Sequence, residues 1–309
     1  MDLSITIVNT EHIRDTLQCL ESIFSSTHTI NFEIFVINNA CTDGSAEIIR
    51  KKFRSVHLIN NKNLEGVATN FNKGFRQSRG RCLLMLNEDC IVMDNCLDKI
   101  VKFLDENKQV GIASPQIINP DGTLQHQARR FPGLLTEFMK RFKGKCVPFK
   151  IRLSDEYPDY RLMRIFQPDS VGGTAMFFRK AALDTVGFFD ERFFIFYEDV
   201  DICKRAKDAG WKIVHFPYAK IVHKKWITRE DIMLSGKVKE KLRYQLLESE
   251  FKYFKKHCGT TSIPMLKCII LSDFIVRLIK SSFLYFISKK SRKIFTHLID
   301  LSNFTLRYK

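Results

Sequence analysis

The chain has 309 residues and is 45% hydrophobic, so it can bury a sizeable core, as one large domain with an appendage. Its nine cysteines include no CxxC pair and no metal-finger spacing, which excludes those motifs and predicts reduced, mostly buried thiols. Of the net charge of +16, residues 220–309 carry +13, with 20 Lys/Arg against 7 Asp/Glu. This basic end predicts an anionic partner, either nucleic acid or an acidic membrane surface.

The first residues, MDLSITIVN, have an acidic second position and no apolar run of signal-peptide length, so we expect the first strand of a cytosolic protein. Further along, strand-like apolar runs alternate with apolar residues at helical spacing. The strand-like runs are 3–8, 32–38, 56–60, 81–87 and 110–118, and the helical stretches are 12–25, 45–53, 67–79 and 95–107. Such alternation predicts an α/β fold with a mostly parallel sheet, helices on both faces, and a ligand site at the carboxyl ends of the strands.

Four of these strands end in two or three polar residues that begin with asparagine, and one further turn is polar. The ends are Asn9-Thr10, Asn38-Asn39, Asn60-Asn61 and Asn87-Glu88-Asp89, and the turn is Asp43-Gly44-Ser45. Asparagine favours turns and caps, which is enough to explain any one of these ends. Four aligned ends favour a ligand site, and the turn at Asp43 is a candidate nucleotide contact. Neither GxGxxG after the first strand nor a Walker loop is present, so a dinucleotide site or P-loop is not supported.

The segment 263–293 places apolar residues on one helical stripe, at Leu271, Phe274, Ile275, Leu278 and Ile279. Charged residues interrupt the stripe, so it is too polar for a comfortable bilayer span. We expect an interfacial helix followed by the basic run KKSRK, suited to anionic lipid headgroups. The alternative is a helix that packs on the rest of the protein with a solvated basic end. No nucleic-acid-binding module is evident in the sequence. Loss of heparin binding without loss of catalysis would argue against a nucleic-acid-binding protein.

Several segments together resemble one known family in order and spacing. They are ITIVNT, VINNACTDGS, NKNLEGVATNFNKGF, LLMLNEDC, NPDGTLQHQARRFP, the long match over 171–213, and IVH. Over residues 3–226 the chain resembles inverting family 2 glycosyltransferases, and most of all the rhamnosyltransferase branch of bacterial surface-polysaccharide assembly. The resemblance implies a GT-A fold, a nucleotide-sugar donor, a divalent metal, and a lipid-linked or oligosaccharide acceptor.

The resemblance assigns metal and donor residues. A divalent cation, Mg²⁺ or Mn²⁺, would neutralise the departing diphosphate, and carboxylate ligands suit it. Asp89 matches the metal-binding aspartate of the family and His223 a late histidine that can complete the shell; the alternative is that Glu88 and Asp89 only cap a turn. The donor-binding candidates are Asn9, Thr10, Asn38, Asp43, Gly66, Asn72, Asn87 and Gly173. Asn38 departs from the usual base-reading aspartate, so the base preference is open.

The carboxylates after the aromatic segment 188–197 match the acidic motif of the family. The resemblance implies that Asp199 is the base that deprotonates the acceptor hydroxyl, with Glu198 beside it to orient the acceptor or share the role. We expect the aromatic side chains to form an apolar wall that excludes water. All three acids, including Asp201, suit the first turn of a helix, and its dipole is expected to lower the pKa of the base. Capping alone explains Asp201, which is not assigned to catalysis.

We therefore expect a GT-A catalytic domain at 1–235, with a donor half at about 1–118 and an acceptor half at about 119–235, and a basic helical extension at 236–309. The expected location is the cytoplasmic face of the cell membrane, through peripheral association. The first candidate donor is dTDP-rhamnose, with UDP-hexose or UDP-N-acetylhexosamine as alternatives. A sugar-nucleotide-binding protein without catalysis is the other hypothesis. The acceptor, the linkage position and the oligomeric state are not readable from the sequence.

Overall fold

The computed structural model describes residues 1–142, 156–224, 237–285 and 289–308. The chain divides into two compact units, Met1–Phe131 with Glu156–Trp226, and Pro132–Asp155 with Ile227–Lys309. The expected boundary at residue 235 lies outside the described residues. The division of the first unit into donor and acceptor halves stays a prediction.

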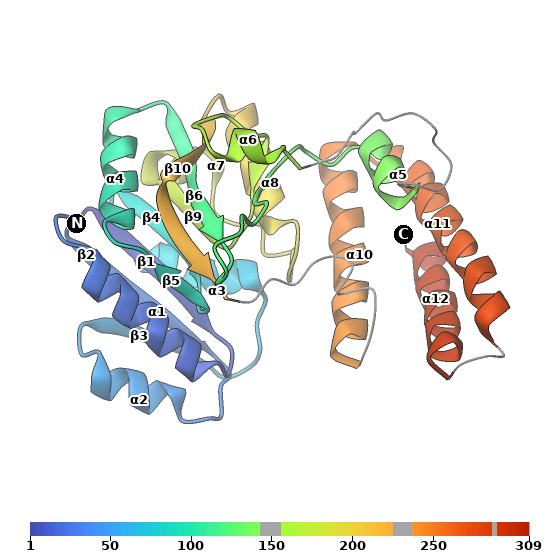
Figure 1. Ribbon diagram of the computed structural model, residues 1–309, viewed down its shortest axis with the longest axis horizontal. Coiled ribbons are helices and arrows are strands. Elements are labelled where there is room, and N and C mark those ends of the chain that lie inside the picture. Colours follow the sequence, from blue (N-terminus) through green and yellow to red (C-terminus); the bar gives the residue numbers. More distant parts are fainter. Residues whose placement is uncertain (143–155, 225–236, 286–288, 309) are drawn as a thin grey trace. The chain divides into compact units, whose positions relative to one another are not determined.

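The first unit alternates strands and helices along the chain (Figure 1). Its strands are β1 (Leu3–Asn9), β2 (Phe32–Asn39), β3 (Val56–Asn61), β4 (Cys82–Asn87), β5 (Cys90–Val92), β6 (Val110–Ile118), β7 (Ala128–Arg129), β8 (Ser170–Val171), β9 (Ala175–Arg179) and β10 (Lys212–His223). Its helices are α1 (Ile13–Ser26), α2 (Ser45–Lys52), α3 (Val67–Gln77), α4 (Cys96–Glu106), α6 (Asp159–Leu162), α7 (Lys180–Val186) and α8 (Glu198–Asp208). The five strands and four helices expected over the first 118 residues are confirmed.

Eight strands form one sheet in the order β3-β2-β1-β4-β9-β6-β10-β5, and β7 pairs with β8 separately. The pairs β1–β2, β2–β3, β1–β4 and β6–β10 are parallel, whereas β9 and β5 run against their neighbours. The expected mostly parallel sheet is therefore confirmed. Because the parallel strands end at the same edge, their terminal polar residues meet there.

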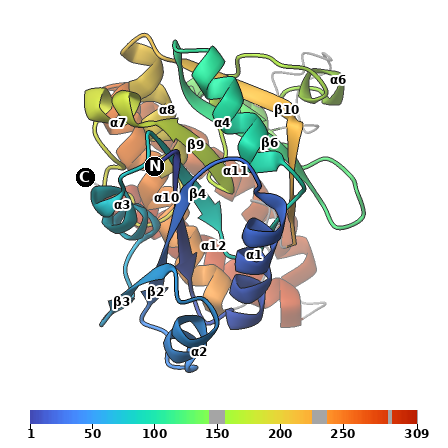
Figure 2. The ribbon, with the colours of Figure 1, turned by 90° about the vertical axis from the view of Figure 1, so that its left-hand side faces the viewer.

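Helices cover both faces of this sheet (Figure 2). On one face, α1 and α4 pack against β1 and β4 through buried residues such as Leu20, Ile100 and Ile5. On the other face, α3, α7 and α8 pack through residues such as Phe75 and Ile202. Strands buried on both faces are mostly apolar along their length, which explains the near-continuous apolar runs in the sequence.

The second unit is helical. Its described helices are α5 (Leu134–Phe142), α10 (Lys237–His257), α11 (Ser262–Tyr285) and α12 (Lys289–Arg307). Phe251 of α10 stacks on Tyr308 at 4.3 Å between ring centroids. Arg141 of α5 forms a buried two-oxygen ion pair with Glu250 of α10, at 2.7 and 2.8 Å. Among the described helices, none is long and apolar enough to cross a lipid bilayer.

Candidate active site

Asparagine side chains form a hydrogen-bonded ladder across the carboxyl ends of β1, β2 and β3. Asn9 Nδ2 donates to Asn38 Oδ1 at 3.0 Å, and Asn38 Nδ2 donates to Asn60 Oδ1 at 3.1 Å. These residues are register partners in neighbouring parallel strands, so their side chains lie on the same face. Asn9 and Asn38 are buried. Within the ladder, the Asn38 oxygen accepts one hydrogen bond and its amide nitrogen donates one. A ligand would therefore meet an amide whose orientation is fixed in advance.

Glu88 joins the ends of β1 and β4. Its two carboxylate oxygens accept hydrogen bonds from the Thr10 backbone N–H and hydroxyl, both at 2.7 Å. Burial raises the pKa of Glu88, while the two Thr10 bonds oppose that rise. Thr10 and Glu88 thus hold the two strand ends together and leave Asp89 as the next residue of the turn.

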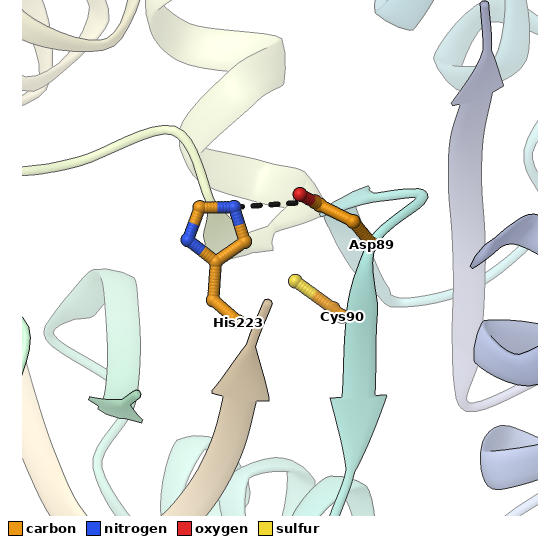
Figure 3. A group of neighbouring side chains, drawn as sticks. All are labelled: Asp89, Cys90 and His223. Atoms are coloured by element: carbon orange, nitrogen blue, oxygen red, sulfur yellow. Dashed lines mark ion pairs between the residues drawn. The ribbon is translucent and has the colours of Figure 1, made fainter. Parts of the chain in front are cut away.

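Asp89 and His223 form the centre of a compact ligand group with Cys90 (Figure 3). Asp89 lies in the two-residue turn between β4 and β5, and His223 ends β10 opposite Cys90. Asp89 Oδ1 lies 3.1 Å from His223 Nε2, and the three candidate ligand atoms lie within 4.8 Å of one another. All three residues are buried. Burial raises the pKa of the Cys90 thiol well above its usual value, which favours the neutral thiol in the absence of a metal.

The hydrogen bonds of this group fit a cation. His223 Nδ1 lies 2.9 Å from Gln125 Oε1, and an amide oxygen can only accept, so Nδ1 carries the proton. In a neutral imidazole the Nε2 lone pair then faces the Asp89 carboxylate. The lone pairs of His223 Nε2 and Asp89 Oδ1, 3.1 Å apart, repel each other unless a proton or a metal ion lies between or beside the two atoms. Carboxylate and imidazole ligands suit Mn²⁺, and carboxylate suits Mg²⁺.

Asp199 is held by the glycine that precedes β9. Gly173 N–H donates to Asp199 Oδ2 at 2.9 Å, and the Val200 N–H donates to Oδ1 at 2.8 Å. A Cβ at position 173 would make a tight contact of 3.0 Å with the Met85 methyl carbon and would lie at ordinary van der Waals distance, 3.7 Å, from Asp199 Oδ2. The next residue, Thr174, accepts a hydrogen bond from the Asn87 N–H at 3.0 Å. Residues 173 and 174 thereby connect the Asp199 carboxylate with the turn that carries Asp89.

The pKa values of the acid pair differ from the expectation. Burial raises the pKa of Asp199, and burial together with the charge of Asp199 raises the pKa of Glu198 to about 8. The expected lowering by the helix dipole is therefore wrong, because desolvation of the charged form dominates. Glu198 is 6% exposed and its Oε2 atom has no hydrogen-bond partner, which fits a neutral carboxyl group. The Val200 N–H bond, the Arg129 charge and the Gly173 N–H bond oppose the rise in the pKa of Asp199.

The backbone before these acids is strained. Phe196 and Tyr197 both have positive φ, of 69° and 67°, a region that non-glycine residues seldom adopt. Tyr197 is the N-cap residue of α8, and Glu198, Asp199 and Asp201 occupy its first turn, as expected. Backbone strain of this kind is typical of functional sites that surrounding structure holds in place.

Two aromatic side chains of 188–197 lie in the core and not in the expected apolar wall. Phe189 is buried in the core beneath α3, with ring contacts to Phe71, Phe75 and Phe178. Phe193 is also fully buried. These two rings anchor the segment to the body of the protein, so the prediction that they line an apolar wall is wrong.

Asp201 has a stronger role than helix capping. It is fully buried, and Arg205 Nε donates to its Oδ2 at 2.9 Å. The Arg205 guanidinium also donates to the carbonyls of Val186, Gly187 and Phe188. Asp201 therefore holds the arginine that ties α8 to the preceding turn, and the dipole alone does not account for it.

Three further predicted donor residues have structural roles in this fold. A Cβ at Gly66 would lie 2.7 Å from the Phe194 carbonyl oxygen, so glycine lets α3 begin against the aromatic segment. Asn72 is 1% exposed, and its amide binds both backbone groups of Phe189 and the Glu191 carboxylate, so it has little capacity for a ligand. Asp43 is exposed and accepts from the backbone and hydroxyl of Ser45 in the turn before α2.

Sequence reasoning missed Gln125, Thr174 and Arg129 as parts of the site. Gln125 contacts His223 from the loop after β6, in the NPDGTLQ segment, where only a resemblance to the family was noted. A glutamine in a polar loop gives no signal by itself, because its partner His223 is 98 residues away.

The fold and the family were compared with known proteins. The model of the family described as Glycosyl transferase family 2 matches residues 4–185. The N-acetylglucosaminyl-diphospho-decaprenol L-rhamnosyltransferase of Mycobacterium tuberculosis is 26% identical over 212 residues, covering 62% of this chain and 66% of that protein. The chain thus spans just under two thirds of that relative. A low-salt glycan biosynthesis hexosyltransferase of Haloferax volcanii is 22% identical over 284 residues, covering 90% and 85%.

Solved structures share the fold. A mannosyltransferase from Pyrobaculum calidifontis, in complex with GDP-Man and Mn²⁺, matches with a TM-score of 0.57 at 14% identity, covering 99% of this chain and 87% of that one. S. aureus TarS 1-349 in complex with UDP-GlcNAc matches with a TM-score of 0.52 at 13% identity, covering 98% and 91%. The sheet, its helices and the acidic turn at the strand ends define a GT-A glycosyltransferase fold. The chain belongs to glycosyl transferase family 2.

Proposed function

We propose that the protein is an inverting glycosyltransferase that moves a sugar from a nucleotide-sugar donor to a lipid-linked or oligosaccharide acceptor in cell-surface polysaccharide synthesis. The observation that carries the proposal is the Asp199 carboxylate, which Gly173 fixes and Thr174 connects to the Asn87-Glu88-Asp89 turn. The family match and the named glycan-synthesis relatives support it. The first candidate donor is dTDP-rhamnose, because the Mycobacterium relative is named a rhamnosyltransferase.

In the proposed reaction, Asp199 takes the proton of the acceptor hydroxyl. The acceptor oxygen forms the new bond to the anomeric carbon. On the opposite side, the bond from that carbon to the diphosphate oxygen breaks, and the nucleoside diphosphate leaves with the electron pair of that bond. The Gly173 N–H keeps one oxygen of Asp199 in place, while its other oxygen accepts from Val200. Glu198 remains neutral at pH 7 and does not compete for the proton.

Asp89 and His223 are the proposed holders of a divalent cation, Mg²⁺ or Mn²⁺. When bound, the cation supplies positive charge to the departing diphosphate. The buried Asp89 carboxylate and the His223 nitrogen are oriented by the strand ends, so little rearrangement is needed. The asparagine ladder at Asn9 and Asn38 lies at the same edge of the sheet and is the proposed place of the nucleotide.

A donor panel tests the proposed activity. Release of nucleoside diphosphate would be measured for dTDP-rhamnose, UDP-hexoses and UDP-N-acetylhexosamines, each with a membrane lipid extract as a source of acceptor. We expect one donor to stand out and its release to require the extract, since the acceptor hydroxyl is the nucleophile. Binding of a donor without release in any combination would favour the alternative, a sugar-nucleotide-binding protein, which Asn38 suggests because the family usually has an aspartate there.

We also propose peripheral association with an anionic membrane through the second unit. Met265, Cys268, Ser272, Ile275 and Ile279 recur on α11 at spacings of three and four and are all exposed, with both isoleucines at 55%. In the predicted stripe, by contrast, Phe274 is buried and Leu271 and Leu278 are partly buried. The side chains of the basic run 289–293 lie outside the described residues. An exposed apolar helix face in a strongly basic region fits a surface of anionic lipid.

A further inference from the structure

Gln125 is a buried side chain in the loop between β6 and β7, 3% exposed, with a complete set of hydrogen bonds around its amide. Its Nε2 donates to the His223 carbonyl at 3.0 Å and to Asn119 Oδ1 at 2.6 Å. Its Oε1 lies 2.9 Å from His223 Nδ1. The one amide therefore joins the end of β10 to the residue that follows β6, its parallel neighbour.

The two acceptors around Nε2 fix which way the amide faces. A flipped amide would place its oxygen against the His223 carbonyl and Asn119 Oδ1, which are both acceptors. The oxygen must therefore face the imidazole, and His223 must carry a proton on Nδ1. Asn119 is in turn fixed because its Nδ2 donates to the Thr123 hydroxyl at 2.8 Å.

We propose that Gln125 is a positioning residue for the metal site: it fixes the tautomer and ring orientation of His223 so that the Nε2 lone pair faces the cation beside Asp89. This inference rests on the proposed metal site. Partners of this kind, which bind the other nitrogen of a ligating histidine, typically contribute 10–100-fold to metal affinity. Gln125 touches neither the cation nor the sugar, so it acts only through His223.

The test measures binding of Mn²⁺ alone, by the electron paramagnetic resonance signal of the free ion, so that no sugar transfer is needed. Gln125→Met keeps the length of the side chain and removes its hydrogen bonds, and about a 10–100-fold weaker Mn²⁺ affinity is expected. The matched control is Gln116→Met, a glutamine on β6 that is also 3% exposed and donates to a backbone carbonyl at 3.0 Å but does not touch His223.

A second readout needs no metal. Nitrogen-15 NMR at a pH where imidazoles are neutral, with the His223 signal assigned by its loss in His223→Gln, should show the Nδ1–H tautomer in the parent and a mixture in Gln125→Met. An Nε2–H tautomer in the parent would overturn the proposal, as would parental Mn²⁺ affinity in a folded Gln125→Met protein. Parental affinity in that variant would leave the metal site standing, whereas a parent that binds no Mn²⁺ would remove the metal site and this inference together.

Discussion

Asp199 and Glu198 show how two adjacent carboxyl groups acquire different chemistry. Both are desolvated, which favours the neutral form, but only Asp199 receives backbone N–H bonds from Gly173 and Val200. Glu198 has one oxygen without a partner and a pKa of about 8. The N–H bonds from Val200 and Gly173 and the charge of Arg129 therefore favour ionisation at Asp199, the proposed base, over its neighbour Glu198.

The raised pKa of Glu198 predicts a pH dependence of stability. The folded protein binds this proton more tightly than the unfolded chain, whose value is 4.5, so the stabilisation is complete below 4.5 and is lost as the pH rises through about 8. We expect the free energy of unfolding of the parent to fall over this window, and Glu198→Gln to show a smaller fall. Urea denaturation at a series of pH values measures this. Parallel pH profiles for the two proteins would contradict the assignment.

Asp89, His223 and Asp199 could be proposed from the sequence, because they lie at strand ends or in a motif shared with a family. The structural role of Asn72 could not be predicted, because its partner Phe189 is 117 residues away and binds it through the backbone, which carries no sequence signal. The pKa of the base was also unpredictable. A helix dipole can be expected from the position of an acid in a helix, whereas burial depends on the packing of distant segments.

At the scale of elements, the site depends on the packing of α3 against the segment 188–197. The Val67 N–H at the start of α3 donates to the Phe194 carbonyl at 2.7 Å, and Asn72 binds the backbone of Phe189. Because Phe194 precedes Glu198 by only four residues, the start of α3 fixes the entry into α8. These contacts fix the segment on the N-terminal side of the strained Phe196 and Tyr197.

Gly66→Ala tests this packing. The added Cβ would lie 2.7 Å from the Phe194 carbonyl oxygen and 2.9 Å from its Cα, atoms of the backbone that cannot simply rotate away. We expect a loss of about 1–3 kcal/mol in the free energy of unfolding, as for other overpacked sites. Gly133→Ala is the control, because the nearest atom to its Cβ is 3.8 Å away. Thermal or urea unfolding of both variants measures this difference. If Gly66→Ala were as stable as Gly133→Ala, the two segments could separate without cost.

Strands and helices were predictable wherever the chain alternates regularly, as it does up to residue 118. The short strands β7 and β8 were not, since two residues give no periodicity, and they form only because Ala128 and Val171 meet across 43 residues. The antiparallel β9 within a mostly parallel sheet was likewise invisible in the sequence pattern. Pairing partners of this kind are fixed by tertiary structure.

At the scale of the whole molecule, the charge distribution and the exposed face of α11 predict membrane binding. The parent should sediment with vesicles that contain anionic lipid at low salt and much less at high salt, because salt screens the attraction. Ile275→Ser with Ile279→Ser should weaken sedimentation, since each buried isoleucine contributes about 1.5–3 kcal/mol. Ile165→Ser, at a 45% exposed isoleucine of the first unit, is the matched control. Equal binding to neutral vesicles, or none to either kind, would contradict the proposal.

The central claim is that Asp199 performs the chemistry while Asp89 holds the metal and donor, and one comparison tests it. Donor affinity by calorimetry with and without Mn²⁺ would be measured beside turnover for Asp199→Asn, Asp89→Asn and a control. The control on α8 is Asp208→Asn, because its exposed ion pair with Lys204 is worth only about 0.3–0.5 kcal/mol. Asp201→Asn is less suitable, because breaking the buried Asp201–Arg205 pair costs about 3–5 kcal/mol. Asp199→Asn should keep Mn²⁺-dependent donor binding while turnover falls by about 10²–10⁴-fold, and Asp89→Asn should lose both. An Asp199→Asn protein that transfers sugar at the parental rate would contradict the account.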